Sequence, residues 1–419
     1  MKALQFRFSI PRYAYSKLIG RWRTSAYWDR WSALAYVEIA EPKLRTDRWV
    51  RVQTQLCGIC GSDMSALFLK GSPDSPLTPF VSFPMVMGHE IVGTVVERGA
   101  TARRVEVGQR VVINPMLSCT PRGIEPPCAA CQAGELSLCR NFAEGLLAPG
   151  MLIGSTRGIN GGFAPFVAVH EDQCIGVPDT VSLEQAVLTD PVAVTLRAIL
   201  RHPPGERDVC LVYGCGILGL GAIACLRALH PNAQIIAVAK YDFQKQLADQ
   251  LGANEVVDPR PERELIATVG KLTGARSYHP MRGKPILMGG VQRVYDCIGG
   301  AGTIETSLRL CDARGTVVII GVDVPKRVEW SPIWFREINL TGSMAVGAES
   351  FEGERLHTYQ VYLELVRDGR LADLGGLVTH RFSLASYADA FATCSGRGGA
   401  VAVKVVFDFD PLGADSASN

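Results

Sequence analysis

The sequence lacks a strong net charge, because 43 lysines and arginines nearly balance 41 aspartates and glutamates and leave a formal charge of +2. Nucleic acid is therefore not an expected partner, since it selects proteins with a basic face. No window reaches the roughly 18 consecutive apolar residues of a membrane span. The first residues, Met1 to Arg7, lack the apolar run of a secretion signal, and the chain has no internal repeat. We therefore expect a cytoplasmic protein with no membrane partner.

The length of 419 residues exceeds what one hydrophobic core usually serves. Apolar residues make up 47% and charged residues 20% of the chain, which provides enough core material for two domains. We expect a globular protein with two domains.

Thirteen cysteines are present, and four of them crowd into one short segment as Cys119, Cys128, Cys131 and Cys139. In a reducing compartment such crowding favours metal ligation over disulfides, and a closed tetrahedral zinc site would fold a loop that has no core of its own. The alternatives are a loop with incidental cysteines and a zinc-ribbon nucleic-acid module, and few basic residues support the latter. Seven further cysteines lie among apolar neighbours and are interpreted as small core residues: Cys174, Cys210, Cys215, Cys225, Cys297, Cys311 and Cys394.

A second group of metal-binding residue types begins at Cys60-Gly61-Ser62-Asp63 and continues at Gly88-His89-Glu90. A thiolate, a hydroxyl and an imidazole beside a carboxylate are the parts of an open zinc site. The alternating pattern of residues 49–57 predicts a half-buried strand that delivers Cys60 to its end. Asp190 precedes Pro191 at the start of a helical pattern, where it could cap the helix or ligate a metal.

A buried strand at 208–213, the turn Gly214-Cys215-Gly216-Ile217-Leu218-Gly219 and a helix at 220–229 predict a dinucleotide site. The first glycine permits the tight turn, the second lets backbone amides approach a pyrophosphate, and the third lets helix pack on strand.

The next strand, at 234–239, ends in Ala239, followed by Lys240 and Tyr241. An acidic residue at this position would bind a ribose 2′-hydroxyl, so its absence favours NADP(H) over NAD(H). The alternatives are that Asp242 turns back toward the ribose or that Lys240 is simply solvated.

Two more buried strands, at 293–300 and 315–322, place backbone at the carboxyl edge of a parallel sheet, where a nicotinamide would lie. Residues of the cofactor site there are predicted to include Cys297, Ile320, Gly321 and Val322. Residues 274–290 are predicted to be an inserted surface loop. A helix at 353–367, a last strand at 401–407 and a disordered tail at 408–419 complete the chain.

The stretch from Pro11 to Trp31 is rich in aromatic and basic residues. We expect its aromatic residues to pack a loop onto the body of the domain. A membrane-surface element and a substrate cover are the alternatives.

With these motifs in this order, the chain resembles the zinc-dependent medium-chain alcohol dehydrogenases over residues 33 to 407, especially the branch that contains threonine, sorbitol and alcohol dehydrogenases. The resemblance implies an α/β fold in which a chaperonin-10-like, β-rich catalytic domain (residues 1–190 and 347–407) carries the structural-zinc loop 119–139. A Rossmann domain with a doubly wound parallel sheet (residues 191–346) would be inserted into it. The resemblance also implies an active site in the cleft and a homodimer or homotetramer.

Carried over residue by residue, the resemblance implies that Cys60, His89 and Asp190 hold the catalytic zinc. The family commonly has Cys or Glu at the position of Asp190, although a carboxylate is a legitimate zinc ligand. Glu90 matches the glutamate that can approach an empty metal site. Cys57 lies where the family uses no ligand, so we interpret it as strand packing.

The same resemblance implies that Ser62 relays the proton of the alcohol to the cofactor ribose and that Asp63 orients His89. Many relatives have a histidine where this chain has Ser65, which leaves the outer part of the proton path undefined. In the structural-zinc loop the first ligand of the family falls on Glu125. We prefer Cys119, because closed structural sites are rich in thiolates.

The sequence therefore predicts a zinc-dependent oxidoreductase that transfers a hydride between a small alcohol or carbonyl substrate and NADP(H), or alternatively NAD(H). The alternatives are a zinc-containing relative that performs another reduction, such as that of an imine, and a nucleotide-binding protein without catalysis.

Overall fold

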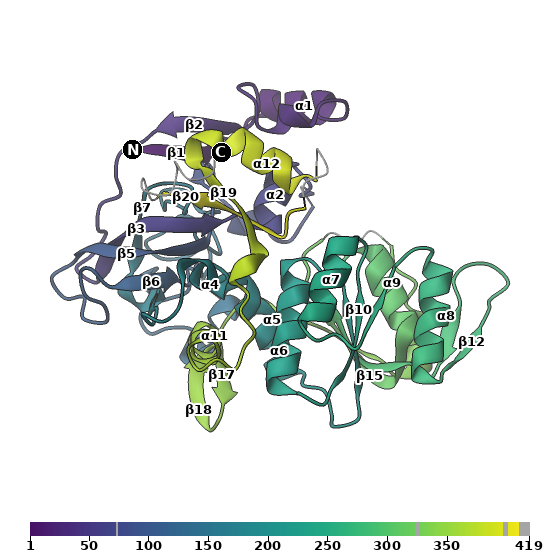
Figure 1. Ribbon diagram of the computed structural model, residues 1–419. Helices are drawn as coiled ribbons and strands as arrows, with labels where there is room; N and C mark the ends of the chain where they lie inside the picture. Colours follow the sequence, from purple (N-terminus) through teal and green to yellow (C-terminus); the bar gives the residue numbers. More distant parts are fainter. Residues whose placement is uncertain (73, 324–326, 397–400, 410–419) are drawn as a thin grey trace, which may run out of the picture. The chain divides into compact units, whose positions relative to one another are not determined.

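The computed structural model describes residues 1–72, 74–323, 327–396 and 401–409. The chain divides into two compact units (Figure 1). Unit 1 comprises Met1–Asp190, Val346–Ala348 and the chain from Asp373, whereas unit 2 comprises Pro191–Ala345 and Glu349–Ala372. The segment Glu349–Ala372, which the sequence interpretation assigned to the catalytic domain, therefore clusters with unit 2.

Unit 1 is built on a seven-stranded sheet with the order β19-β20-β3-β5-β6-β8, to which β7 adds by pairing with β3. In β3 the side chains of Val50, Val52, Thr54 and Leu56 are all buried, which confirms the alternation predicted there. A smaller sheet has the order β2-β1-β4. The strands are β1 (Lys2–Phe6), β2 (Leu34–Glu38), β3 (Trp49–Gly58), β4 (Met85–Val86), β5 (Glu90–Arg98), β6 (Arg110–Ile113), β7 (Phe166–His170), β8 (Cys174–Gly176), β19 (Val378–Ser383) and β20 (Lys404–Asp408).

Unit 2 is a parallel six-stranded sheet with the order β11-β10-β9-β14-β15-β16. Helices α6 and α7 cover one face, and α8 and α9 cover the other (Figure 1). This doubly wound arrangement confirms the predicted α/β fold class. The strands are β9 (Val209–Tyr213), β10 (Gln234–Val238), β11 (Glu255–Val257), β14 (Val291–Asp296), β15 (Cys311–Ile319) and β16 (Asn339–Gly342), and the helices are α5 (Thr189–Arg201), α6 (Ile217–Leu229), α7 (Asp242–Gln250), α8 (Glu262–Thr273), α9 (Ala301–Leu310), α10 (Ser331–Arg336) and α11 (Thr358–Arg367).

Three local predictions were wrong. Residues 274–290 form a hairpin of β12 (Arg276–Tyr278) and β13 (Ile286–Met288), which begins where Gly274 ends α8 in the left-handed conformation. The helix predicted from residue 353 begins only at Thr358. Glu352 and Gly353 have positive φ and turn the chain between β17 (Ala348–Phe351) and β18 (Glu354–His357).

The third difference concerns the aromatic stretch, which forms helix α1 (Ile10–Ile19) and a 3-10 turn (Thr24–Tyr27) and not a loop. Trp28 is buried in the core of unit 1, whereas Trp22 and Trp31 are exposed. Of the tail predicted at 408–419, Asp408 belongs to β20, and residues 410–419 lie outside the described residues.

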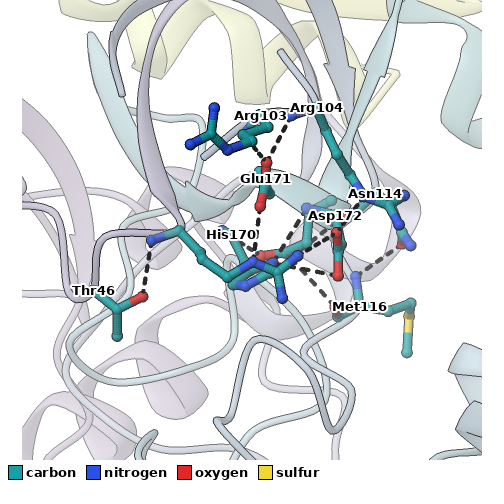
Figure 2. A network of polar contacts seen from close by, with 10 residues as sticks. Thr46, Arg103, Arg104, Asn114, Met116, His170, Glu171 and Asp172 are labelled. Atoms are coloured by element: carbon teal, nitrogen blue, oxygen red, sulfur yellow. Dashed lines mark hydrogen bonds and ion pairs between the residues drawn. The ribbon is translucent and has the colours of Figure 1, made fainter. Parts of the chain in front are cut away.

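A buried polar network joins three loops of unit 1 (Figure 2). The carboxylate of Glu171 accepts hydrogen bonds from the backbone N–H groups of Arg103 (2.6 Å) and Arg104 (2.7 Å) and from the Nε of Arg48 (2.8 Å). Burial opposes its ionisation, but the bonds from Arg104, Arg48 and Arg103 lower the pKa of Glu171 overall. Asp172 pairs with Arg104 at 2.8 Å. We interpret this network as structural support for the sheet.

Candidate metal and nucleotide sites

Cys60 is presented by the turn that connects β3 to helix α2 (Gly61–Leu67). Its Sγ accepts a hydrogen bond from the N–H of Ser62 at 3.5 Å, and the carboxylate of Asp63 accepts one from the N–H of Cys60 at 2.9 Å. This reciprocal cap fixes the direction of the thiol at the N-terminus of α2.

His89 and Glu90 meet Cys60 at the start of β5. One ligand atom from each of these three residues lies within 4.8 Å of the other two. Sulfur, imidazole nitrogen and carboxylate oxygen are the donors that zinc prefers, so the donor set fits the metal. Strand and turn geometry thus brings together residues that are about 30 positions apart in the sequence.

Asp63 lies behind His89. Its Oδ1 is 3.8 Å from the Nδ1 of His89, and both side chains are buried. Burial by itself would lower the pKa of His89, but the charges of Asp63 and Cys60 raise it well above its usual value. Because Nδ1 faces Asp63, Nε2 is the nitrogen left for a metal.

Lys404 of β20 was missed by the sequence interpretation. Its Nζ lies 2.6 Å and 2.8 Å from the two carboxylate oxygens of Glu90, and it also donates to the carbonyl of Ile59 at 3.2 Å. The side chains of Lys404 and Glu90 are only 2% and 1% exposed. A single lysine within the apolar run Val401–Phe407 was the signal in the sequence, because such a charge is buried only with a partner.

We predict that Lys404→Met lowers the free energy of unfolding by about 3–5 kcal/mol, because it leaves the carboxylate of Glu90 buried without its counter-ion. Denaturant unfolding measures the change. The double variant Lys404→Met/Glu90→Gln is the matched control and should recover most of the loss. A single variant as stable as the wild type would contradict the importance of this pair.

Asp190 lies in the first turn of α5, at the end of the first segment of unit 1. Burial lowers the pKa of His89, whereas the charges of Asp63 and Cys60 raise it. The charge of Asp190 also raises the pKa of His89, by a smaller amount. The group of ligand atoms within 4.8 Å contains Glu90 and does not contain Asp190, among the residues that the structure describes.

The four loop cysteines converge on one point. The ligand sulfurs of Cys119, Cys128, Cys131 and Cys139 all lie within 4.8 Å of one another, and Cys119 and Cys139 are 3.6 Å apart. Glu125, by contrast, is exposed. Four sulfurs at this spacing are the donor set of a closed structural zinc site.

Backbone and amide N–H groups surround these sulfurs. Cys119 Sγ accepts from the side chain of Asn141 at 3.1 Å and from the N–H of Cys128 at 3.3 Å, and Cys128 Sγ accepts from the N–H of Arg140 at 3.5 Å. Burial opposes ionisation of Cys128, but the N–H groups of Arg140 and Cys131 lower its pKa to about 6. This favours the thiolate at Cys128, whereas burial raises the pKa of Cys131 and raises that of Cys139 to about 11.

Arg122 organises the loop from within. Its buried guanidinium donates to the carbonyls of Leu117 (2.8 Å), Glu144 (2.9 Å) and Ala148 (3.1 Å), and it therefore replaces an apolar core by hydrogen bonds. The short helices α3 (Ala129–Gln132) and η3 (Leu136–Leu138) carry the intervening chain.

In unit 2 the turn after β9 has the shape of a phosphate cradle. Gly214 adopts a φ of 91°, which excludes other residues. A Cβ on Gly219 would overlap the carbonyl oxygen of Gly214, whereas a Cβ on Gly216 would meet no atom within 4 Å. Gly216 therefore borders open space at the N-terminus of α6, where Ile217 and Leu218 are half-buried, and this space fits a pyrophosphate.

Basic groups gather after β10, where the chain has Ala239 in place of an acidic residue. The Nζ of Lys240 lies 5.2 Å from the ring centroid of Tyr241. Arg260, which the sequence interpretation missed, donates to the carbonyl of Lys240 at 3.0 Å. Nothing in the sequence indicates this contact, because Arg260 lies 20 residues beyond Lys240.

The remaining predicted cofactor residues follow the carboxyl ends of β14 and β15. Cys297 is next after β14, and Ile320, Gly321 and Val322 follow β15 directly. The two strands are parallel neighbours, so these residues lie at the same edge of the sheet as the glycine turn. Val322 is exposed, and Ile320 is buried.

Two family models match the chain. Residues 46–179 match the alcohol dehydrogenase GroES-like domain, and residues 218–359 match the zinc-binding dehydrogenase domain. The (R,R)-butanediol dehydrogenase of Saccharomyces cerevisiae is 30% identical over 79% of this chain and 85% of its own length. The sorbitol dehydrogenase of Arabidopsis thaliana is 29% identical over 86% and 88%.

Solved structures agree with these matches. The 2R,3R-butanediol dehydrogenase of Bacillus subtilis has a TM-score of 0.69 at 26% identity over 90% of this chain and 96% of its own. A zinc-binding dehydrogenase from Sinorhizobium meliloti, described as putative and solved with bound NADP, has a TM-score of 0.67 at 28% identity over 90% and 95%. No helix in the described residues is long and apolar enough to cross a membrane.

Proposed function

Because the chain belongs to the zinc-dependent medium-chain alcohol dehydrogenase family and is an NAD(P)-dependent oxidoreductase, we propose that it transfers a hydride between NADP(H) and a small alcohol or polyol or its carbonyl partner. The observation that carries the proposal is the cluster of Cys60, His89 and Glu90 in unit 1, in a chain whose unit 2 has an open glycine cradle. The cluster in unit 1 supplies a metal site, and the glycine cradle in unit 2 supplies a cofactor site.

Cys60 and His89 would hold the catalytic zinc, which when bound acts as a Lewis acid and lowers the pKa of an alcohol. For the third ligand we propose Asp190. Both oxygens of Glu90 already bind Lys404, so recruiting Glu90 to the metal would break a buried ion pair. The electrostatic effect of Asp190 on His89 supports its proximity.

Ser62 is the proposed route for the proton of the substrate. It is exposed in the first turn of α2, two residues beyond Cys60, so its hydroxyl is free to accept a proton from an alcohol and pass it on. Asp63 keeps its proposed role of orienting His89, and Ser65 leaves no imidazole to continue the path at its position.

The four loop cysteines are the proposed structural zinc site. Their mutual distances and their N–H donors support Cys119 as the first ligand, and the exposure of Glu125 speaks against Glu125. Zinc bound there would hold the loop folded and take no part in hydride transfer.

The preference for NADP(H) is supported by the basic groups after β10. Lys240 and Arg260 are in contact directly after β10, and two cations there would favour a 2′-phosphate. Ala239 stands in place of the acidic side chain that would repel it. Asp242 pairs with Lys245 at 3.2 Å, and Asp258 pairs with Arg260 at 3.4 Å, so Lys240 is the cation of this group that forms no ion pair in the described part of the chain.

Ala239→Asp should reverse the cofactor preference. We predict that the ratio of kcat/KM for NADPH over NADH falls by about ten- to a hundredfold, because a carboxylate repels the 2′-phosphate and binds the 2′-hydroxyl. Arg260→Ala should lower the same ratio by about tenfold, since it removes the guanidinium that contacts Lys240 and the positive charge that it carries. Lys271→Ala, an exposed change on α8, is the control and should leave the ratio unchanged. A wild-type enzyme that prefers NADH would contradict the proposed preference.

The proposal is tested by a panel of alcohols, polyols and the matching carbonyls, run with NADP(H) and NAD(H) before and after removal of zinc by a chelator. Turnover of an alcohol that is lost on chelation and restored by zinc is the expected result. An enzyme that reduces only imines would favour the alternative reduction. An enzyme with zinc and nucleotide bound but no turnover would favour a binding protein.

A further inference from the structure

Helix α1 turns an apolar face to the outside of unit 1. Ile10, Pro11, Ala14 and Leu18 are exposed, and their spacing places them on one side of the helix. Ile10 is 77% and Leu18 56% exposed. A surface helix of a globular protein normally turns its apolar stripe toward the core, so this orientation is reversed.

Contacts on the opposite side of α1 enforce the orientation. Tyr13 packs against the core of unit 1, and the hydroxyl of Ser16 donates to the carbonyl of Ala26 at 3.1 Å. Arg12 donates to the carbonyl of Ser32 at 2.6 Å, and Tyr15 donates to Asp29, also at 2.6 Å. The helix therefore cannot roll its apolar face inward without losing these bonds.

Two exposed tryptophans extend the apolar surface. Trp22 lies three residues beyond the end of α1 and is 78% exposed, and Trp31 at the end of the same segment is 58% exposed. We call Ile10, Leu18, Trp22 and Trp31 the outer patch. In Figure 1 α1 lies at the periphery of unit 1. The match to the GroES-like family model begins at residue 46, so the patch lies outside the part of the chain that this model describes.

The charged residues of the segment around the outer patch are nearly all basic. Residues 1–28 contain six lysines and arginines and no acidic residue: Lys2, Arg7, Arg12, Lys17, Arg21 and Arg23. Asp29 is the first acidic residue, and it pairs with Arg23 at 2.7 Å. Arg7, Arg21 and Arg30 are exposed and form no ion pair within the described part of the chain. Arg7 donates to the side chain of Gln5 at 2.6 Å, and Arg30 lies 5.0 Å from the ring centroid of Trp31. Neither contact neutralises the positive charge, so these arginines can attract an anionic partner.

We propose that α1 and the turn after it bind the surface of an anionic lipid bilayer, with the outer patch inserted at the level of the headgroups. An exposed apolar helix face with tryptophan at its end and unpaired arginines beside it combines the two attractions that such binding needs. At ten residues, α1 lies in the interface and does not cross the bilayer. A second copy of the chain is a poorer occupant, because a twofold contact would bring two basic segments together. This inference does not depend on the proposed catalytic function.

The test is cosedimentation of the full-length protein with sucrose-loaded vesicles of phosphatidylcholine alone or mixed with phosphatidylglycerol. We expect binding to the mixed vesicles only, with loss at high salt. Leu18→Ser/Trp22→Ser should weaken binding by about tenfold or more, and Arg21→Gln/Arg30→Gln by about tenfold or more. Brominated phosphatidylcholine in the mixed vesicles should quench tryptophan fluorescence of the wild type and less that of the first variant.

The matched control is Trp334→Ser/Phe335→Ser, which removes two exposed aromatic residues from α10 in unit 2 and should bind as the wild type does. Circular dichroism checks that each variant is folded. Absence of binding, equal binding to both kinds of vesicle, or wild-type binding by both the Leu18→Ser/Trp22→Ser and the Arg21→Gln/Arg30→Gln variants would overturn the proposal. Loss of self-association in the Leu18→Ser/Trp22→Ser variant without vesicle binding would instead identify a contact between copies.

Discussion

Replacement of Cys60 by alanine is expected to lower kcat/KM by about a thousandfold or more and to remove one of the two proposed zinc ions. Cys60 is held by the cap of α2 with its sulfur toward His89 and Glu90, and no other described thiol joins this group. Without the thiolate the site loses the ligand that zinc binds most tightly, and a Lewis acid contributes several kcal/mol to such a reaction. Steady-state kinetics and zinc content by mass spectrometry measure the two effects.

Cys57→Ala is the matched control for this prediction, because Cys57 and Cys60 form a Cys-x2-Cys pair that resembles a ligand pair in sequence. Cys57 is fully buried in β3, where it lies opposite Ile91 of β5 and its thiol contacts the carbonyl of Gly58 at 3.7 Å. Burial raises the pKa of its thiol well above the usual value. We expect this variant to keep both zinc ions and its turnover. Loss of zinc from Cys57→Ala, or turnover retained by Cys60→Ala, would contradict the assignment.

Cys119→Ala is expected to release the structural zinc and to lower the free energy of unfolding by about 5 kcal/mol. The loop 119–139 owes its shape to the four sulfurs and to Arg122, so three thiols would hold the metal far less tightly. Denaturant unfolding and zinc content measure the change. Addition of a chelator to the wild type should reproduce the loss of stability.

Glu125→Ala distinguishes the two candidates for the first ligand of that site. The side chain of Glu125 is exposed, so its removal should change neither the zinc content nor the unfolding midpoint. If Glu125→Ala releases the structural zinc while Cys119→Ala retains it, the loop uses the carboxylate and Cys119 is a core residue.

Lys404 links the proposed catalytic metal site to β20, the last strand of the described residues. Burial of an ammonium is costly, yet the charge of Glu90 raises the pKa of Lys404 overall despite that burial. The same contact occupies both oxygens of Glu90, which is why we assign the third ligand to Asp190. Whether Glu90 or Asp190 is the third ligand therefore depends on the ion pair between Glu90 and Lys404, and Lys404 belongs to neither of the motifs that contain these carboxylates.

The sequence by itself determined the two-domain α/β fold and the residue types of each site. The alternation of apolar and polar residues in residues 49–57 is a local property, and so is the glycine turn after residue 213. The period of a hydrophobic pattern and the backbone φ that a residue can adopt both depend on residues that are neighbours in the sequence. Thiolate and imidazole chemistry likewise belongs to the residue type, so Cys60, His89 and the cysteines of the loop could be selected without coordinates. The three local failures were at Gly274, Glu352-Gly353 and Ile10, where turns and caps set the boundaries.

Only the tertiary structure decided which of these groups meet. Lys404 and Glu90 are 314 residues apart in the sequence, and no periodicity relates them. Cys119 reaches the other sulfurs through a loop whose path depends on Arg122, and Arg260 returns to Lys240 because two parallel strands end side by side. The outward face of α1 was equally invisible, because the direction of a helix is set by the residues that hold its other side. Contacts between distant residues depend on packing, and packing is a property of the whole fold.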